Sequence, residues 1–395
     1  MQINKDKKKS LFIKSYGCQM NEYDSERMAE ILEPLNYAPV SEPEKADLII
    51  LNTCHIREKA AEKIYSELGR IKKINYKNKN EAKIAVAGCV GQAEGQEIID
   101  RSPIVDLVFG PLTYHQLPEM LKAIDTKKGF PSKKLVNIEV PDVDKFDELK
   151  GSRKSLKSIS SLLSVQEGCD KFCSFCVVPY TRGVEISRPA GQILKEAIEL
   201  IDNGAKELIL LGQNVNAWSG EGFDEENWSF PKLIKELSKL NIERIRYITS
   251  HPKDMTDELM RSHQDIEKLQ PYLHLPVQSG SDKVLKEMNR GYTFSQYMKI
   301  INKTREYRPD IAVSGDFIVG FPGETDKDFE DTLKIVEEVR YAHAYSFKYS
   351  SRPGTPASMM ENHIDETVKS ERLKILQELI KKYTRDFNKS FLGKE

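Results

Sequence analysis

Short apolar runs separated by amphipathic stretches fill the first 125 residues of the chain. The amphipathic stretches have a helical period, for example over residues 21–32 and 56–69. Strands that alternate with helices of this length form parallel sheets built from βαβ units. We therefore expect an N-terminal Rossmann-like parallel α/β domain over residues 1–125. Its predicted strands cover residues 11–16, 47–51, 83–87 and 105–109.

The alternation fails between residues 126 and 157, where Pro, Gly, Ser and charges of both signs mix without an apolar period. Such composition is typical of a linker, and we expect one that crosses the surface.

From residue 158 the alternation returns, and it continues to residue 386. Six predicted strand–helix units are too many for one mononucleotide-binding half and too few for a closed eight-stranded barrel. We therefore expect an α/β partial (β/α)6 barrel over residues 158–386. The predicted strands are 162–166, 207–211, 244–249, 272–277, 312–319 and 344–348.

The composition and the absence of long apolar runs argue against a membrane or secreted protein. The 395 residues include 60 Lys and Arg against 61 Asp and Glu, giving a formal net charge of -1. No apolar run has the length that a membrane span requires. The first residues lack the apolar core of a signal peptide. We therefore expect a cytoplasmic protein without membrane contact, whose six cysteines stay reduced.

Three of the cysteines lie within one loop that follows the first predicted barrel strand. Their spacing is Cys169-x3-Cys173-x2-Cys176. Thiolates bind zinc or iron–sulfur clusters, and a closed tetrahedral zinc site would need a fourth ligand. A 4Fe–4S cluster held by three cysteines would keep one iron open for a substrate or cofactor. Two alternatives remain, which are a zinc knuckle completed by a distant His and three unconnected buried cysteines.

The other three cysteines each follow a predicted strand of the first domain. They are Cys18, Cys54 and Cys89. Because the carboxyl ends of parallel strands share one edge of a sheet, we expect these thiols to lie close together. A single Cys at such a place is more often a small buried hydrophobe, but these three account for every Cys of the domain. We therefore favour a second cluster of three cysteines.

These cysteines and the segments around them resemble a known family. The C-x3-C-x2-C loop resembles the signature of radical S-adenosylmethionine enzymes, and the three earlier cysteines resemble the N-terminal domain of methylthiotransferases. Further segments resemble the bacterial branch that makes 2-methylthio-dimethylallyladenosine in the tRNA anticodon loop. They include YGCQMNEYDSERM, NTCHIREKAAEK, VVPYTRG, LLGQNVNAW, HLPVQSGSDKVLKEMNR and DFIVGFPGET. The family usually ends in a small RNA-binding β-barrel, and residues 387–395 would be only the start of that module.

The resemblance implies two 4Fe–4S clusters and two molecules of S-adenosyl-L-methionine per turnover. Cys169, Cys173 and Cys176 would hold the radical cluster. One electron from this cluster would cleave S-adenosylmethionine to a 5′-deoxyadenosyl radical, which would abstract hydrogen from carbon 2 of the adenine. The auxiliary cluster on the N-terminal cysteines would supply the sulfur. No catalytic residue beyond the clusters is predicted, because the histidines are typical of hydrogen-bonded structural groups.

The resemblance also implies which residues contact the cofactor. Gln213 and Asn214 would contact its methionine amino end, and Gln278 and Ser279 its ribose. Phe175 would lie against the adenine, and the backbone at Gly320 would approach the cofactor closely. Turn chemistry alone would also explain the polar and glycine residues among these.

Two arginines that flank the radical loop, Arg182 and Arg188, are candidates for substrate phosphate or a carboxylate, since a guanidinium matches such groups. A surface ion pair is the alternative.

The expected partners are the tRNA anticodon stem-loop, an electron donor such as flavodoxin or ferredoxin, and an iron–sulfur cluster carrier, with the chain acting as a monomer. Two other functions stay open. One is a sister methylthiotransferase that acts on threonylcarbamoyladenosine in tRNA or on an aspartate of a ribosomal protein. The other is a non-catalytic iron–sulfur or zinc scaffold that binds RNA.

Overall fold

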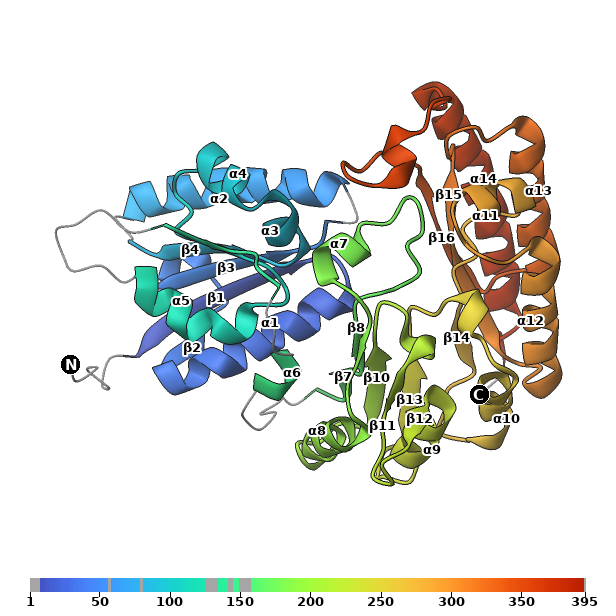
Figure 1. Ribbon diagram of the computed structural model, residues 1–395, viewed down its shortest axis with the longest axis horizontal. Helices are drawn as coiled ribbons and strands as arrows, with labels where there is room; N and C mark the ends of the chain where they lie inside the picture. Colours follow the sequence, from blue (N-terminus) through green and yellow to red (C-terminus); the bar gives the residue numbers. More distant parts are fainter. Residues whose placement is uncertain are drawn as a thin grey trace. The chain divides into compact units, whose positions relative to one another are not determined.

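The computed structural model describes residues 8–55, 58–78, 81–124, 134–140, 145–148 and 158–393. The chain divides into two compact units. Unit 1 comprises residues 1–156 and 178–183, and unit 2 comprises residues 157–177 and 184–395 (Figure 1). The short segment 178–183 therefore belongs to unit 1 although it lies between two parts of unit 2 in the sequence.

Unit 1 is a parallel sheet with helices on both faces. The strand order is β2-β1-β3-β4-β5-β6, and every neighbouring pair is parallel. Its strands are β1 (Lys9–Tyr16), β2 (Tyr37–Pro39), β3 (Leu48–Thr53), β4 (Lys83–Ala87), β5 (Leu107–Phe109) and β6 (Leu135–Asn137). Its helices are α1 (Gln19–Leu32), α2 (Glu58–Asn78), α3 (Cys89–Glu94), α4 (Gln96–Arg101), α5 (Leu117–Ile124), α6 (Lys145–Glu148) and α7 (Val178–Arg182).

Alternate residues of these strands supply two separate cores. Helices α1 and α5 cover one face of the sheet, and α2, α3 and α4 cover the other (Figure 1). Leu48 and Ile50 of β3 belong to the core under α1 and α5, whereas Ile49 and Leu51 belong to the core under α2, α3 and α4. A strand buried on both faces is continuously hydrophobic, and for this reason the apolar run of β3 could be predicted as a strand from the sequence. The predicted Rossmann-like domain is confirmed, and the sequence pattern missed only the short strands β2 and β6.

The predicted linker was wrong where the structure describes it. β6 extends the sheet beside β5, and Lys145 and Phe146 of α6 are buried in unit 1. A strand of three residues is too short to show an alternating pattern, so composition alone suggested a loop. The rest of the predicted 126–157 linker lies outside the described residues.

Unit 2 carries the six predicted strand–helix repeats and two small two-stranded ribbons. The ribbons are β8 (Gln166–Glu167) with β9 (Ile186–Ser187) and β11 (Ser219–Glu221) with β12 (Asn227–Ser229). The main strands are β7 (Ser160–Ser164), β10 (Glu207–Leu211), β13 (Arg244–Tyr247), β14 (Tyr272–His274), β15 (Ala312–Val319) and β16 (His343–Lys348). The helices are α8 (Ala190–Asp202), α9 (Phe230–Ser238), α10 (Asp257–Asp265), α11 (Asp282–Glu287), α12 (Phe294–Tyr307), α13 (Asp326–Val339) and α14 (Glu366–Lys389).

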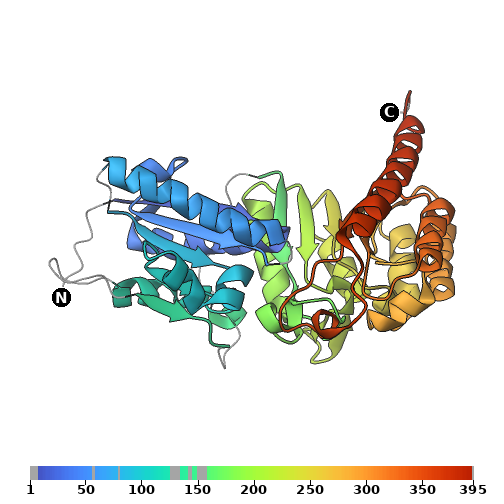
Figure 2. The same cartoon turned by 90° about the horizontal axis from the view of Figure 1, so that it is seen from above.

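The six main strands form an open half-barrel. β13-β10-β7 and β14-β15-β16 are parallel sheets, and a parallel bridge from Ile245 to Leu269 joins them near β14. The hydrophobic core of unit 2 lies between the strands and the surrounding helices, and α14 packs against β16 and α13 (Figure 2). The predicted partial (β/α)6 barrel is therefore confirmed.

The opposite face of the strands is more polar. The Ser314 hydroxyl lies at hydrogen-bond distance, 2.7 Å, from both the Tyr272 hydroxyl and His274 Nδ1. His274 Nε2 lies 3.5 Å from an Asp316 carboxylate oxygen. Ser314 and Asp316 alternate along β15 with Val313 and Phe317, which belong to the hydrophobic core under the helices. The polar residues therefore lie on the face of the strand that the helices do not cover.

Two further observations concern the chain as a whole. The predicted module boundary at residue 386 falls inside α14, which ends at Lys389, and residues 390–393 form turns. Lys394 and Glu395 lie outside the described residues.

Among the helices of the described part, none is both long and apolar enough to cross a membrane.

Candidate functional site

The three cysteines of unit 1 occupy the carboxyl ends of three adjacent strands. Cys18 follows β1 as the N-cap of α1, Cys54 follows β3, and Cys89 begins α3 directly after β4. A side chain on Gly17 would meet Cys54 Cβ at 2.2 Å, so this glycine lets the two loops approach each other closely. The sheet thus brings together thiols that lie far apart in the sequence.

The ionisation of these thiols differs. A hydrogen bond with Cys54 lowers the pKa of Cys18 to about 6, and the charge of Arg182 acts in the same direction. Burial raises the pKa of Cys89, an effect that Arg182 partly offsets. Because thiolates are the form that binds metal, cluster assembly at this site would release protons.

Alkylation of the metal-free, reduced chain should separate the two groups of cysteines. Cys18 is exposed, and its reaction rate with iodoacetamide should level off above about pH 6, where it is a thiolate. Burial raises the pKa of Cys169 to about 11, so its rate should still rise with pH under mildly alkaline conditions. Mass spectrometry of the labelled peptides measures both. Equal labelling of Cys18 and Cys169 at neutral pH would contradict the expected order.

Arg182 lies beside the cysteines of unit 1 in a buried group of charges. Its Nη2 lies 2.7 Å from one Asp24 oxygen, and Lys145 Nζ lies 3.7 Å from the other. Lys145 also donates to the Pro111 carbonyl at 3.1 Å. All three side chains are at most 2% exposed. This environment favours the ion-pair alternative over contact with substrate, although the pair is buried rather than on the surface.

The cysteines of unit 2 lie on one loop after β8. Cys173 is buried, whereas Cys169 and Cys176 are partly exposed. Gly168 at φ +75° and Phe172 at φ +46° turn the backbone, and the Cys176 N–H donates to the Cys173 carbonyl at 2.9 Å. Positive φ at a bulky Phe is uncommon and indicates that the surroundings hold this loop firmly.

The end of α11 holds the loop from one side. The Asn289 amide donates to the carbonyls of Lys171 and Phe172, at 3.3 and 2.9 Å. The Ser174 N–H donates to the Met288 carbonyl, and the Ser174 hydroxyl donates to the backbone carbonyl of Glu287.

Another side of the loop is held by an ion pair, in which Lys171 meets Asp254 at 2.7 Å. The loop geometry therefore depends on residues that are more than 80 positions away in sequence.

Gln213 and Asn214 lie at the carboxyl end of β10, against the same loop. Gln213 Oε1 accepts from the Gly168 N–H at 2.5 Å, and the Asn214 amide donates to Asp254 at 2.9 Å. Gln213 Nε2 and Asn214 Oδ1 are buried atoms with no hydrogen-bond partner among the described residues. An unpaired donor and acceptor in this position fit a polar ligand, because burying such groups unpaired is costly.

The other predicted cofactor residues take up varied positions. Gln278 has φ +76°, a strained conformation for a non-glycine residue that is often found at functional sites. Ser279 is fully buried, and its hydroxyl lies 3.2 Å from that of Thr332. Phe175 packs against a small apolar cluster that contains Phe321 and Met288. The Ser279 hydroxyl therefore already has partners within the fold.

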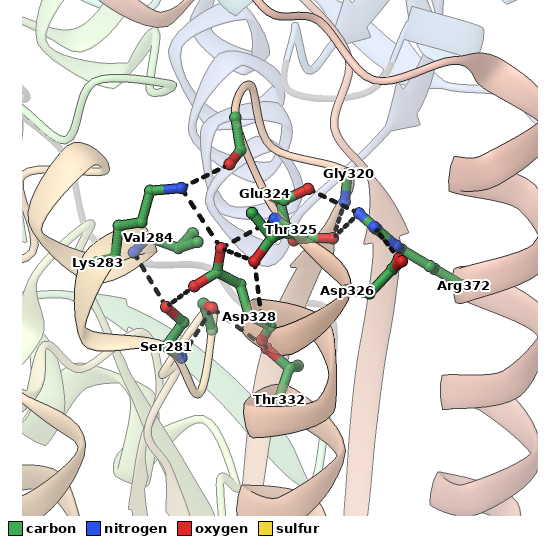
Figure 3. A network of polar contacts seen from close by, with 12 residues as sticks. Ser281, Lys283, Val284, Gly320, Glu324, Thr325, Asp326, Asp328, Thr332 and Arg372 are labelled. Atoms are coloured by element: carbon green, nitrogen blue, oxygen red, sulfur yellow. Dashed lines mark hydrogen bonds and ion pairs between the residues drawn. The ribbon is translucent and has the colours of Figure 1, made fainter.

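Gly320 directly follows β15 and lies within a dense polar network (Figure 3). Its N–H donates to Glu324 Oε1 at 2.9 Å, and Arg372 of α14 donates to the same oxygen at 2.8 Å. A side chain on Gly320 would meet Lys369 Cγ at 2.4 Å. The glycine is therefore required at least for packing against α14, and its backbone N–H is already engaged.

A second part of this network joins α11 to α13. The Ser281 hydroxyl donates to Asp328 at 2.6 Å, and Thr325 donates to the other Asp328 oxygen at 2.7 Å (Figure 3). These contacts fix the N-termini of both helices relative to the end of β15.

Arg188 is also committed to an internal contact. Its Nη2 lies 2.9 Å from Glu196, its Nη1 donates to the Ser164 carbonyl, and its side chain is only 6% exposed. These contacts favour the ion-pair alternative for Arg188, with the pair buried rather than on the surface. The spacing of an arginine from a motif does not reveal whether a carboxylate on the next helix meets it.

Two residues near the radical loop were not predicted from the sequence. Arg290 contacts Cys173, and His251 lies beside Arg290 with its ring 5.6 Å from Tyr292. Burial, reinforced by the charges of Arg290, Lys171 and Lys253, lowers the pKa of His251 to about 2, so the ring is neutral. The segment LKEMNR contains Arg290, but nothing in its pattern indicates a contact with a cysteine across the fold.

The donor chemistry of both cysteine trios fits iron–sulfur clusters, since thiolate sulfur is their usual ligand. The unpaired atoms of Gln213 and Asn214 fit a polar cofactor beside the second trio. Within the described residues, no three His, Cys, Asp or Glu side chains form a ready-made metal site. Each trio would therefore have to draw its sulfurs together around a cluster.

Comparisons with known proteins agree with this architecture. A family described as "Uncharacterized protein family UPF0004" matches residues 10–110, and the "Radical SAM superfamily" matches residues 163–336. The radical S-adenosylmethionine methyltransferase TsrM from Kitasatospora setae has a TM-score of 0.61 at 12% identity, covering 89% of this chain and 75% of that chain. The cobalamin-dependent radical enzyme OxsB has a TM-score of 0.59 at 14% identity. That match covers 95% of this chain, which spans only 56% of the length of OxsB.

Fold and family matches together define the chain as a radical S-adenosylmethionine protein with an additional N-terminal domain. A curated relative from Agrobacterium fabrum, a tRNA-2-methylthio-N(6)-dimethylallyladenosine synthase, is 53% identical over 393 residues. The match covers 98% of this chain and 85% of the relative. The chain therefore belongs to the family of tRNA-2-methylthio-N(6)-dimethylallyladenosine synthases.

Proposed function

We propose that this chain inserts a methylthio group at carbon 2 of dimethylallyladenosine in the anticodon loop of tRNA. The observation that carries the proposal is the presence of one cysteine trio in each unit, at the ends of three parallel strands in unit 1 and on the loop after β8 in unit 2. The close curated relative supports the choice of this reaction. Because anticodon-loop bases are already unpaired, the enzyme needs little energy to reach the target base.

The residues of the two units have separate roles in this proposal. Cys169, Cys173 and Cys176 would hold one 4Fe–4S cluster, and Cys18, Cys54 and Cys89 the other. When bound, the first cluster supplies the electron that cleaves S-adenosylmethionine and the second supplies the sulfur. The chain itself orients these groups and excludes water.

The polar residues at the end of β10 would bind the methionine part of the cofactor. Asn214 Oδ1 can accept a hydrogen bond from the cofactor amino group, and Gln213 Nε2 can donate one to its carboxylate. Gln278 would face the ribose, and Phe175 the adenine. Ser279 and Gly320 would shape the site through the backbone, since their polar groups already have partners. A cytoplasmic location would keep all six thiols reduced.

The other partners follow from this chemistry. A one-electron donor such as flavodoxin or ferredoxin would reduce the radical cluster, and an iron–sulfur carrier would load the clusters. We propose that the chain works as a monomer, since each trio is complete within one unit.

Anaerobic reconstitution tests the proposal. We expect two 4Fe–4S clusters per chain and, with reductant, conversion of S-adenosylmethionine to 5′-deoxyadenosine. Stoichiometric zinc without cofactor cleavage would instead indicate a non-catalytic scaffold.

The substrate is tested separately by mass spectrometry of tRNA nucleosides from a strain that lacks this protein. We expect the methylthio form of dimethylallyladenosine to disappear and its unmodified precursor to accumulate. Complementation with the intact gene is the control. Unchanged levels would contradict the proposed substrate and favour a sister methylthiotransferase.

A further inference from the structure

Arg290 is a buried cation beside the radical loop. The residue is only 6% exposed. The three nitrogens of its guanidinium each donate to a different group. Nη1 donates to Cys173 Sγ at 3.3 Å, Nη2 to the Pro276 carbonyl at 2.7 Å, and Nε to the Tyr292 hydroxyl at 2.9 Å. The guanidinium is thus held in one orientation with one edge against the sulfur.

The end of α11 places Arg290 in this position. The Arg290 N–H donates to the Leu285 carbonyl, and Asn289 adopts the left-handed conformation at φ +56° that ends many helices. The Asn289 side chain bonds the cysteine loop at Phe172, one residue before Cys173. Two consecutive residues therefore connect the end of α11 to the loop. Asn289 donates to backbone carbonyls of the loop, and Arg290 donates to the Cys173 sulfur.

The charge of Arg290 needs an anion nearby. Burying an unpaired charge is strongly unfavourable, and no carboxylate of the described residues forms an ion pair with Arg290. Burial raises the pKa of Tyr292, so its phenol is neutral, and His251 is neutral as well. The guanidinium itself stays protonated in proteins. Cys173 is therefore the one contact here that becomes an anion when it binds iron.

We propose that Arg290 is a positioning residue for the radical cluster: it donates a hydrogen bond to the Cys173 sulfur and raises the reduction potential of that cluster. The inference depends on the proposed function, in which this trio holds a 4Fe–4S cluster. Reduction adds one electron, supplied by dithionite or by the physiological donor, and breaks no bond. Because a nearby cation stabilises the more negative reduced state, it makes reduction easier, and hydrogen bonds to cluster sulfurs act in the same direction.

Redox titration of reconstituted protein, followed by electron paramagnetic resonance, tests the proposal without measuring turnover. Mutation of residues that contact metal ligands typically costs about 10–100-fold in metal affinity or activity, and we take the same range for the reduction equilibrium. We expect Arg290→Met to lower the reduction equilibrium constant of the radical cluster by such a factor. Each factor of ten corresponds to about 59 mV for a one-electron couple. Arg290→Lys keeps the charge and should shift the potential less, in the same direction.

A matched control removes an arginine elsewhere in unit 2. Arg308 pairs with Asp310 at the amino end of β15, and Arg308→Met should leave the potential unchanged. An Arg290→Met protein with a full cluster at the wild-type potential would overturn the inference. A raised Kd for S-adenosylmethionine at unchanged potential would also overturn it, by assigning Arg290 to the cofactor. Failure of the wild-type protein to bind any cluster at this loop would instead refute the proposed function.

Discussion

Replacing Cys173 with alanine should abolish reductive cleavage of S-adenosylmethionine, whereas replacing Cys89 should spare cleavage and stop methylthio transfer. The reason is that the two cysteines belong to different units, each with a complete trio of its own. Anaerobic assays of 5′-deoxyadenosine and of methylthiolated tRNA measure the two steps separately. Each variant should retain iron for only one cluster.

The Cys173 variant needs a control, because it also removes the sulfur that Arg290 contacts. Cys169→Ala removes a ligand of the same trio but leaves that contact intact, and it should abolish cleavage equally. Circular dichroism of the metal-free proteins shows whether the fold survives. Equal loss of cleavage in the Cys173 and Cys89 variants would mean that the two trios do not divide the reaction as proposed.

The long strands and the cysteine positions could be predicted from the sequence because both are local signals. β4, β10 and β15 have the bounds that their apolar runs indicate. Parallel topology then places the ends of β1, β3 and β4 side by side, which brings Cys18, Cys54 and Cys89 to one edge. Little more than the period of the pattern and the geometry of parallel sheets was needed.

Contacts between distant segments could not be predicted in this way. Whether an arginine meets substrate or a carboxylate depends on which residue the fold brings beside it, as Glu196 shows for Arg188. The same holds for Arg290, which lies 117 positions from the cysteine that it contacts. Short elements such as β6 fail for a different reason, because three residues carry too little pattern to distinguish a strand from a loop.

The buried charges of unit 1 lead to the largest expected effect on stability. Asp24 is fully buried and is shared by Arg182 and Lys145. Asp24→Ala removes the carboxylate while both cations stay in place, and breaking a buried pair from one side typically costs about 3–5 kcal/mol. We expect the urea midpoint of the metal-free chain, followed by circular dichroism, to fall accordingly.

Hydrogen exchange can locate this loss within the chain. Peptides from β1 and β3 of unit 1 should lose protection in Asp24→Ala, whereas β10 and β13 of unit 2 should keep theirs, since Asp24 lies in unit 1. A control is Glu42→Ala, which removes an exposed ion pair with Lys45 in the same unit and should leave the midpoint unchanged. If Asp24→Ala were as stable as Glu42→Ala, the buried charges could not be what anchors α7 and α6 to unit 1. Arg182 would then be a weakly held group beside the cysteines rather than a fixed one.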